Sequence, residues 1–191
     1  MSSYGDYSLD KHKHNLAAWA ASRAASSSPK CRFKVQIGFE IIEKSGLQAA
    51  CADWSNIPTR QNFDTWHQQT CVSVRNCVSE NKLVSDPFTF SYGIAAKLVN
   101  CYMKVLFLGV SNIGPEAKEF WDNLHPPIDR LLLSELANKK VGGHTKIWRS
   151  KKYHGWSNFD QNDYEEVIRL VRKVTDGKLW RIEHYWPGHQ R

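Results

Sequence analysis

The sequence predicts an all-α protein, and three observations support that fold class. Residues 158–175 put Tyr164, Val167 and Val171 on one helical face, which makes this segment the clearest amphipathic helix in the chain. Residues 92–130 lead from a small-residue turn into an apolar helix. Residues 32–47 alternate as a strand would, but no second segment offers that strand a partner. We therefore predict a helix there as well.

Composition and charge limit the possible functions. At 191 residues the chain fits one domain spanning residues 1–191. Hydrophobic residues make up 41% of it, which is enough for a core and argues against disorder. The 26 Lys and Arg residues outnumber the 19 Asp and Glu residues, for a net charge of +7. Such a balance favours a polyanion, most simply nucleic acid, although many basic proteins bind none.

Neither a membrane segment nor a metal site is expected. The chain has no run of about 18 apolar residues, and its first residues lack the apolar region of a signal peptide, so a cytoplasmic protein is predicted. The five cysteines are odd in number and contain no Cys-x-x-Cys pair. This pattern predicts reduced thiols, no metal and no cofactor.

The first half of the chain reads as helices separated by loops. Residues 10–26 predict a helix that ends at a serine run and Pro29, and residues 32–47 predict a second helix with Gly46 as its cap. Residues 51–60 are expected to form a loop. The later elements are a helix over residues 62–79 and a connector over residues 82–90.

The segment from Tyr92 to Arg130 is the one around which the chain is organised. Gly93 and the alanines after it let the first turn of a helix approach another surface, and Lys97 lies where the chain enters that helix. Gly114 precedes a second helical arm over residues 117–124. The segment thus predicts a helical hairpin.

The same segment ends on His125-Pro126-Pro127-Ile128-Asp129. The prolines force an extended approach, so Asp129 is expected to start a helix over residues 130–136. Asp129 follows Lys97 by 129 − 97 = 32 residues. That spacing is enough for the hairpin to return Asp129 to the neighbourhood of Lys97.

A lysine and an aspartate at two helix starts can support attack at a sugar C1′ carbon. Burial can lower the pKa of the Lys97 amine and make it a nucleophile, and Asp129 can steer a proton or stabilise a developing positive charge. The alternatives are that Lys97 is a solvated lysine of an amphipathic helix and that Asp129 is only an N-cap.

These residues carry a resemblance. The motifs GIAAKLVN and HPPIDR resemble the core of the helix-hairpin-helix DNA glycosylases, in which a lysine follows a glycine-containing hairpin and a later P-x-D supplies the catalytic aspartate. The spacing of Lys97 and Asp129 is most similar to that of the archaeal 8-oxoguanine glycosylase (AGOG) branch. Ala95 departs from the family, which usually has a second glycine there for the phosphate contact of the hairpin.

The whole chain also resembles a group of small bacterial proteins. Their pattern is W-A-A-x-R-A near the start, a K-L-V-N-like helix, HPPIDR, and a W-x-x-E-x-x-W end, which here begins at Trp180. Some glycosylases of bacterial anti-phage defence excise heavily modified bases, and this resemblance implies that the chain belongs with them.

The resemblances imply a two-lobed helical fold with its core hairpin and catalytic segment at about residues 91–136. A target base would be flipped out of double-stranded DNA into a groove between the lobes. Lys97 would be the nucleophile and Asp129 the group that stabilises the sugar cation. Further base contacts could come from Trp19 or Trp66. The residues expected to contact DNA or the base are Tyr92, Gly93, His125, Arg130, Lys146, Trp148, Arg149, Lys151, Lys152 and Trp156.

The segment over residues 139–156 mixes basic residues, glycines and aromatic residues. As a flexible loop it would suit phosphate contacts and stacking on an exposed base. The alternative is a solvated loop whose tryptophans reach into the core. Beyond it, Gly177 is expected to cap the helix over residues 158–175, and Trp180, Ile182 and Trp186 are expected to belong to the core.

The function predicted from the sequence is therefore that of a monomeric DNA glycosylase, with or without a strand-cleaving lyase step. The archaeal resemblance implies oxidised guanine as the target, and the defence-associated one implies glucosylated hydroxymethylcytosine. The first alternative is a DNA-binding helix-hairpin-helix module without chemistry. A weaker alternative is a role of the basic aromatic segment in binding RNA or protein.

Overall fold

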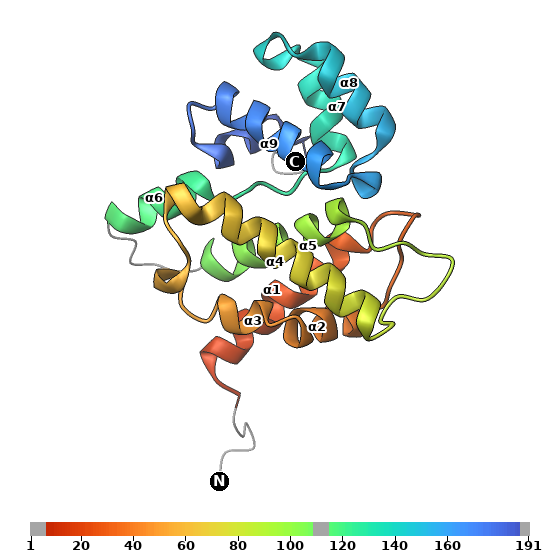
Figure 1. Ribbon diagram of the computed structural model, residues 1–191. Coiled ribbons are helices and arrows are strands. Elements are labelled where there is room, and N and C mark those ends of the chain that lie inside the picture. The colour runs from red at the N-terminus through yellow and green to blue at the C-terminus, as the bar shows by residue number, and fades with distance from the viewer. Residues whose placement is uncertain (1–6, 109–114, 188–191) are drawn as a thin grey trace.

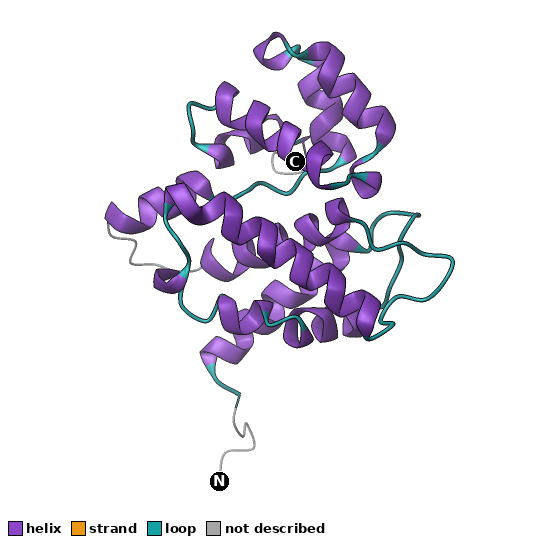
Figure 2. Cartoon of the chain, viewed as in Figure 1, coloured by secondary structure: helices purple, strands orange, loops and turns teal. Residues whose placement is uncertain are grey.

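The computed structural model describes residues 7–108 and 115–187, and within these ranges the chain forms helices and loops without a strand (Figure 2). The all-α prediction is confirmed. The α-helices, in chain order, are α1 (Leu9–Ala25), α2 (Val35–Lys44), α3 (Leu47–Ala50), α4 (Arg60–Glu80), α5 (Tyr92–Leu108), α6 (Pro115–Asn123), α7 (Arg130–Asn138), α8 (Thr145–His154) and α9 (Gln161–Val174). The 3-10 helices are η1 (Trp54–Asn56), η2 (Val141–Gly143), η3 (Trp156–Asn158) and η4 (Leu179–Tyr185).

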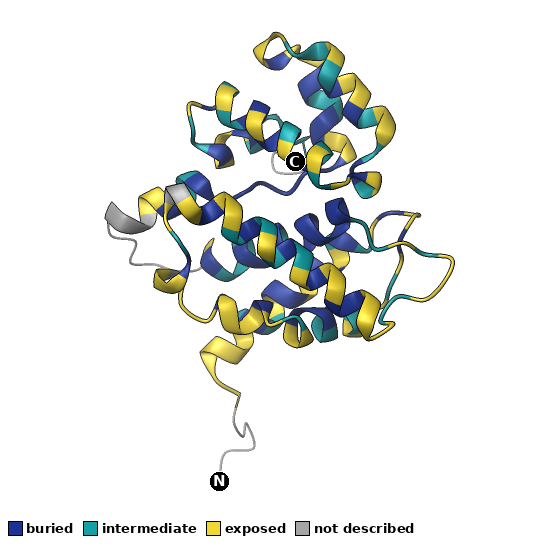
Figure 3. Cartoon of the chain, viewed as in Figure 1, coloured by how far each residue is buried: buried dark blue, intermediate teal, exposed yellow. Residues whose placement is uncertain are grey.

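The helices gather in two groups. Helices α1 to α5 pack together in the lower part of Figure 1, and α7, α8 and α9 lie above them. Residues 124–129 run as extended chain between the groups, and every one of them is buried (Figure 3). Because α5 contacts both η3 and α9, it joins the lower group to the upper one. The segment that leads to Asp129 therefore lies inside the molecule.

Small side chains bring α5 into the centre of the core. Ala17, Ala18 and Ala21 of α1 are completely buried, as are Ala95 and Ala96 of α5, and these two helices share the most extensive contact in the fold. The methyl side chain of alanine takes up little space between two helix backbones, so α1 and α5 pack closely. The first nine residues of α5, including the charged one, are all buried.

The helix predicted over residues 32–47 is present as α2, which is followed at once by α3. Its strand-like alternation does not reflect a strand, because Ile41 and Ile42 are adjacent and both completely buried. A strand would send two adjacent side chains to opposite faces. A helix can bury both on one face, and α2 packs against α1, α3 and α4.

The prediction of a flexible loop over residues 139–156 is wrong. This segment forms η2 and then α8, and only the turns around them are irregular. Its glycines lie at the boundaries, at positions 142, 143 and 155, each with a positive φ. The ten residues of α8 between them contain no glycine or proline, so nothing interrupts the helix.

The end of the chain matches the prediction in part. Helix α9 begins with a capping box between Asp160 and Asp163, and the Gly177 amide donates to the Arg172 carbonyl after its last turn. In η4, Ile182 is buried as predicted. Trp180 is exposed instead, and its indole N–H donates to Asp122 of α6 at 2.9 Å.

Other predictions concern features outside these helices. The hairpin turn containing Gly114 lies outside the described residues, whereas its second arm is present as α6. The five cysteines are all unpaired. Within the described ranges, no helix combines the length and the apolar character needed to cross a lipid bilayer. No group of three or more His, Cys, Asp or Glu side chains suited to a metal ion occurs among residues 7–108 and 115–187.

Candidate functional site

The structure brings Lys97 and Asp129 together. Lys97 lies in the second turn of α5 and is only 7% exposed, so it is not the solvated lysine of the alternative interpretation. Its Nζ atom is 3.8 Å from Oδ2 of Asp129 and 4.0 Å from the centre of the Trp156 ring. One buried amine thus has a carboxylate on one side and an indole face on another.

Asp129 has a different partner for each carboxylate oxygen. Its backbone is extended, and its Oδ1 atom accepts a hydrogen bond of 2.9 Å from the Leu132 amide, which makes it the N-cap of α7. Its Oδ2 atom faces the Lys97 amine. The N-cap interpretation and the proximity to lysine are therefore both correct, since the cap fixes the direction of the second oxygen.

Burial changes the ionisation of Lys97. Removal from water lowers the pKa of the Lys97 amine below its usual value, and the Asp129 carboxylate opposes this shift without cancelling it. Burial also raises the pKa of the nearby Cys101 thiol to about 12. Cys101 is therefore protonated near neutral pH and adds no charge beside Lys97. At a given pH, a larger fraction of the Lys97 amine is therefore neutral than of the amine of an exposed lysine.

Trp156 reaches Lys97 because α8 ends at His154 and the chain turns at Gly155 back toward α5. A Cβ atom on Gly93 would lie 1.9 Å from the Trp156 carbonyl oxygen, so only glycine leaves room for this turn. The Gly93 amide donates to the Phe159 carbonyl at 3.0 Å, and the Ile94 amide donates to Ser91 Oγ. These amides are used within the protein. The prediction that Gly93 contacts DNA is wrong.

Lys97, Asp129 and Trp156 line a pocket of about 690 Å³. Such a volume is typical of small-molecule sites, which span about 300–1,000 Å³. Three segments enclose it: the connection from α1 to α2, the start of α7, and the turn from α8 to η3. The complete lining is Ser27, Ser28, Pro29, Lys30, Lys97, Asp129, Arg130, Leu131, Lys152, Tyr153, His154, Gly155, Trp156, Ser157 and Asn158.

Positive charge and an exposed aromatic ring surround this pocket. Lys30, Arg130 and Lys152 line it from three different segments, and Tyr153 is 82% exposed. Arg130 and Lys152 were predicted from the sequence. Lys30 was missed, because a single lysine after a serine run gives no signal for a contact that only the fold creates.

Two residues of α8 contradict the predicted DNA contacts. Trp148 is completely buried, and its indole N–H donates to the Val141 carbonyl at 2.9 Å. It packs in the core and cannot stack on a base. The Lys151 ammonium is 2.7 Å from the Asp163 carboxylate and 2.6 Å from that of Glu166. Burial alone would lower the pKa of the Lys151 ammonium, but these two carboxylates raise it. The positive charge of Lys151 is thus already paired with Asp163 and Glu166 instead of being available for a phosphate.

Tyr92 and His125 are also interior residues rather than DNA contacts. Tyr92 is almost completely buried and packs against the ring of Tyr164. The His125 imidazole lies 3.0 Å from the Asp64 carboxylate and 3.1 Å from the Tyr164 hydroxyl. Its partners come from α4 and α9, which the local sequence around HPPIDR could not indicate.

The remaining predicted contacts lie outside the pocket. Lys146 and Arg149 are exposed on α8 but do not line it. Trp19 is exposed on α1, and Trp66 is half-buried on α4, and neither lines it either. Only Arg130, Lys152 and Trp156 of the predicted DNA or base contacts lie beside Lys97 and Asp129.

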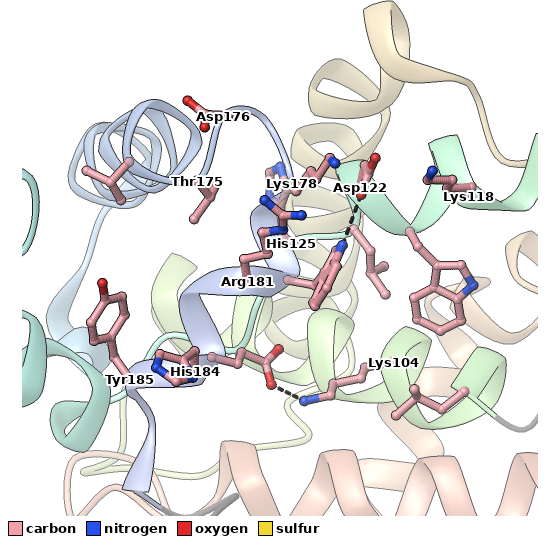
Figure 4. Close-up of a pocket in the computed structure, with 16 residues that line it drawn as sticks. Lys104, Lys118, Asp122, His125, Thr175, Asp176, Lys178, Arg181, His184 and Tyr185 are labelled. Carbon is pink, nitrogen blue, oxygen red and sulfur yellow. Dashed lines mark hydrogen bonds and ion pairs between the residues drawn. The ribbon is translucent and has the colours of Figure 1, made fainter.

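A second, larger pocket of about 1150 Å³ lies among the end of α5, α6, the end of α9 and η4 (Figure 4). Among its lining residues, Lys104 pairs with Glu183, and the Trp180 indole donates to Asp122. His125 lines this pocket, whereas Lys97 and Asp129 do not. The predicted lysine and aspartate therefore belong to the smaller cavity.

No family model, curated protein or solved structure matches the chain.

Proposed function

We propose that this protein is a DNA glycosylase that takes a modified base from duplex DNA and cleaves its bond to the sugar. The observation that carries the proposal is the 3.8 Å approach of the Lys97 amine to the Asp129 carboxylate beside a pocket. A lysine on α5 and an aspartate at the start of α7 meet there although 32 residues separate them, by 129 − 97.

Lys97 supplies the nucleophile. Its neutral amine attacks C1′ of the target nucleotide, forming a C1′–N bond while the bond to the base breaks. The base leaves with the electron pair of that bond and takes up a proton. Burial supports this role, because it lowers the pKa of the amine and increases the neutral fraction.

Asp129 stabilises the positive charge that develops on the sugar. Its Oδ2 atom is directed toward the site by the hydrogen bond that Oδ1 accepts from the Leu132 amide. A carboxylate fixed before the reaction begins needs no reorganisation when the charge appears. Where Lys97 forms a Schiff base with the opened sugar, elimination then cleaves the strand; where water attacks instead, an abasic site remains.

The pocket supports recognition of a base outside the stack. Trp156 offers an aromatic face beside the reacting groups, and Lys30, Arg130 and Lys152 offer charge for the phosphates around a flipped nucleotide. The net charge of +7 agrees with a polyanionic partner. Oxidised guanine and glucosylated hydroxymethylcytosine are the two targets that the sequence motifs imply.

A release assay tests the proposal. Purified protein is incubated with an 8-oxoguanine duplex, with phage DNA carrying glucosylated hydroxymethylcytosine, and with ordinary genomic DNA, and freed base and abasic sites are measured. We expect release from one modified substrate. Borohydride should trap a covalent complex if Lys97 forms the Schiff base.

The matched variants are Asp129→Asn and Lys97→Gln. Asparagine caps helices as well as aspartate does, so Asp129→Asn keeps α7 intact and removes only the negative charge. We expect it to reduce base release to a small residual rate with DNA binding retained. Full activity in this variant would contradict the proposal, and salt-sensitive binding without release from any substrate would favour a DNA-binding module without chemistry.

A further inference from the structure

We propose that Asn100 is a positioning residue that sets the separation of the Lys97 amine and the Asp129 carboxylate. This inference rests on the proposed function and concerns a residue to which the sequence motifs give no role. Asn100 lies on α5, 100 − 97 = 3 residues after Lys97, and it is completely buried.

All the hydrogen-bonding groups of the Asn100 amide are engaged. Its Nδ2 group donates to the Pro126 carbonyl at 3.1 Å and to the Tyr164 hydroxyl at 2.8 Å. Its Oδ1 atom is 2.7 Å from Nε2 of His67 and accepts from it. Three partners on three different segments therefore fix the orientation of this side chain.

The bond to Pro126 connects the two halves of the candidate site. Pro126 is three residues before Asp129, by 129 − 126, on the extended segment between the helix groups. Its carbonyl is bound by the same helix that carries Lys97. Because the prolines restrict the backbone between this bond and Asp129, a shift at Pro126 is carried to the carboxylate.

A second set of contacts holds the other side of this segment. His125 is bonded to Asp64 and to Tyr164, and Tyr164 in turn accepts from Asn100. Without Asn100, these contacts keep the segment in the molecule but lose their hydrogen bond to α5. We therefore expect a displaced carboxylate rather than an unfolded protein.

The test compares Asn100→Ala with Tyr102→Phe. Tyr102 lies on the same helix, is equally buried, and donates or accepts a hydrogen bond of 2.9 Å with Nδ1 of His14 on α1. Tyr102→Phe thus removes a buried hydrogen bond from α5 without affecting the segment before Asp129. Both variants are measured for thermal stability, for affinity to substrate DNA and for the single-turnover rate of base release.

We expect Asn100→Ala to lower the release rate about 100-fold, as a displacement of about 1 Å at reacting groups can do, while DNA affinity is retained. Tyr102→Phe should lose stability and keep its rate. An unchanged rate in Asn100→Ala, or an equal rate loss in Tyr102→Phe, would overturn the proposal.

A double-mutant cycle tests whether Asn100 acts through Asp129. In the Asp129→Asn background the carboxylate is already gone, so Asn100→Ala should have little further effect on the residual single-turnover rate. Additive losses would show that Asn100 acts on something else and would refute the positioning role.

A crystal structure of Asn100→Ala separates this inference from the proposed function. We expect the Asp129 carboxylate to move away from Lys97 with α5 unchanged. If the wild-type protein releases no base, the glycosylase proposal fails, and the structure of the variant still decides whether Asn100 sets the separation. An unmoved Asp129 would overturn it.

Discussion

Gly93 and Trp156 touch through their backbones: the Trp156 carbonyl oxygen occupies the space in which a side chain at position 93 would begin. This contact joins the first turn of α5 to the turn after α8. It also brings the Trp156 ring to 4.0 Å from the Lys97 ammonium. A glycine predicted to contact DNA instead assembles the wall of the candidate site.

Gly93→Ala should therefore destabilise the protein and displace Trp156. At an exposed helical position this substitution stabilises by about 0.5–1 kcal/mol, whereas forcing a methyl group into a packed contact costs about 1–3 kcal/mol. Urea denaturation shows whether the free energy of unfolding of Gly93→Ala is higher or lower than that of the wild type, and this sign decides between the two effects. A stabilised variant with full base release would show that the contact is not needed.

The pH dependence of base release should follow Lys97. Burial lowers the pKa of its amine below 10.5, and only the neutral amine attacks, so the rate should rise with pH and level off below that value. Asp129 raises this pKa, so Asp129→Asn should move the inflection to lower pH. The inflection can be followed in the acylation of the Lys97 amine by mass spectrometry, and a shift to higher pH would contradict the assignment.

Adjacent lysines should respond differently to replacement by glutamine. Lys152 lines the pocket, whereas Lys151 is held by Asp163 and Glu166. Lys152→Gln should weaken DNA binding and reduce the slope of log affinity against log salt by about 1. Lys151→Gln should leave that slope unchanged and lower the melting temperature. Equal slopes for Lys152→Gln and the wild type would exclude a phosphate contact.

The buried histidines should make the fold sensitive to acid. Burial lowers the pKa of His67 and of His125 in the folded protein below the ordinary value of 6.5. Below that pH the unfolded chain binds more protons, so the free energy of unfolding should fall as the pH falls. His67 and His125 together contribute up to about 2.7 kcal/mol per pH unit to this slope, and His14, whose pKa burial also lowers, adds to it.

Urea denaturation between about pH 5 and 7.5 measures this slope, in a range above the ordinary pKa of Asp64 at 3.8. His67→Phe removes one titrating group from the buried cluster. It should therefore lower the slope of unfolding free energy against pH by up to about 1.4 kcal/mol per pH unit, the contribution of one proton. The same slope in wild type and variant would mean that His67 does not titrate with unfolding.

The sequence was sufficient for features that depend on local pattern. The helix that became α9 was predictable because its apolar face, its N-terminal aspartates and Gly177 agree with one another. The proximity of Lys97 and Asp129 was predictable from the extended HPPID segment and the helical hairpin before it. The first feature depends on residues that are neighbours in the sequence, and the second depends on the single spacing between Lys97 and Asp129.

The sequence was insufficient where contacts come from distant elements. Asn100, His67 and Asp64 each resemble an ordinary polar residue of a helix, and Tyr164 resembles an ordinary residue of an apolar helix face. Only the packing of α4, α5 and α9 brings them together. The basic and aromatic composition of the α8 segment predicts a loop, but its uninterrupted length forms a helix. Trp148, which that composition predicts as a stacking residue, fills the core.

The candidate nucleophile and the walls of its pocket belong to parts of the fold with different constraints. Lys97 lies on a helix enclosed by α1, α4, α9 and η3, where almost any change of volume is felt. Residues 27–30 and 152–158, which form most of the pocket wall, lie largely at or beyond helix ends. Under the proposed function, these two segments can change to admit a different base while Lys97 and Asp129 are retained. Relatives with other substrates should differ first in residues 27–30 and 152–158.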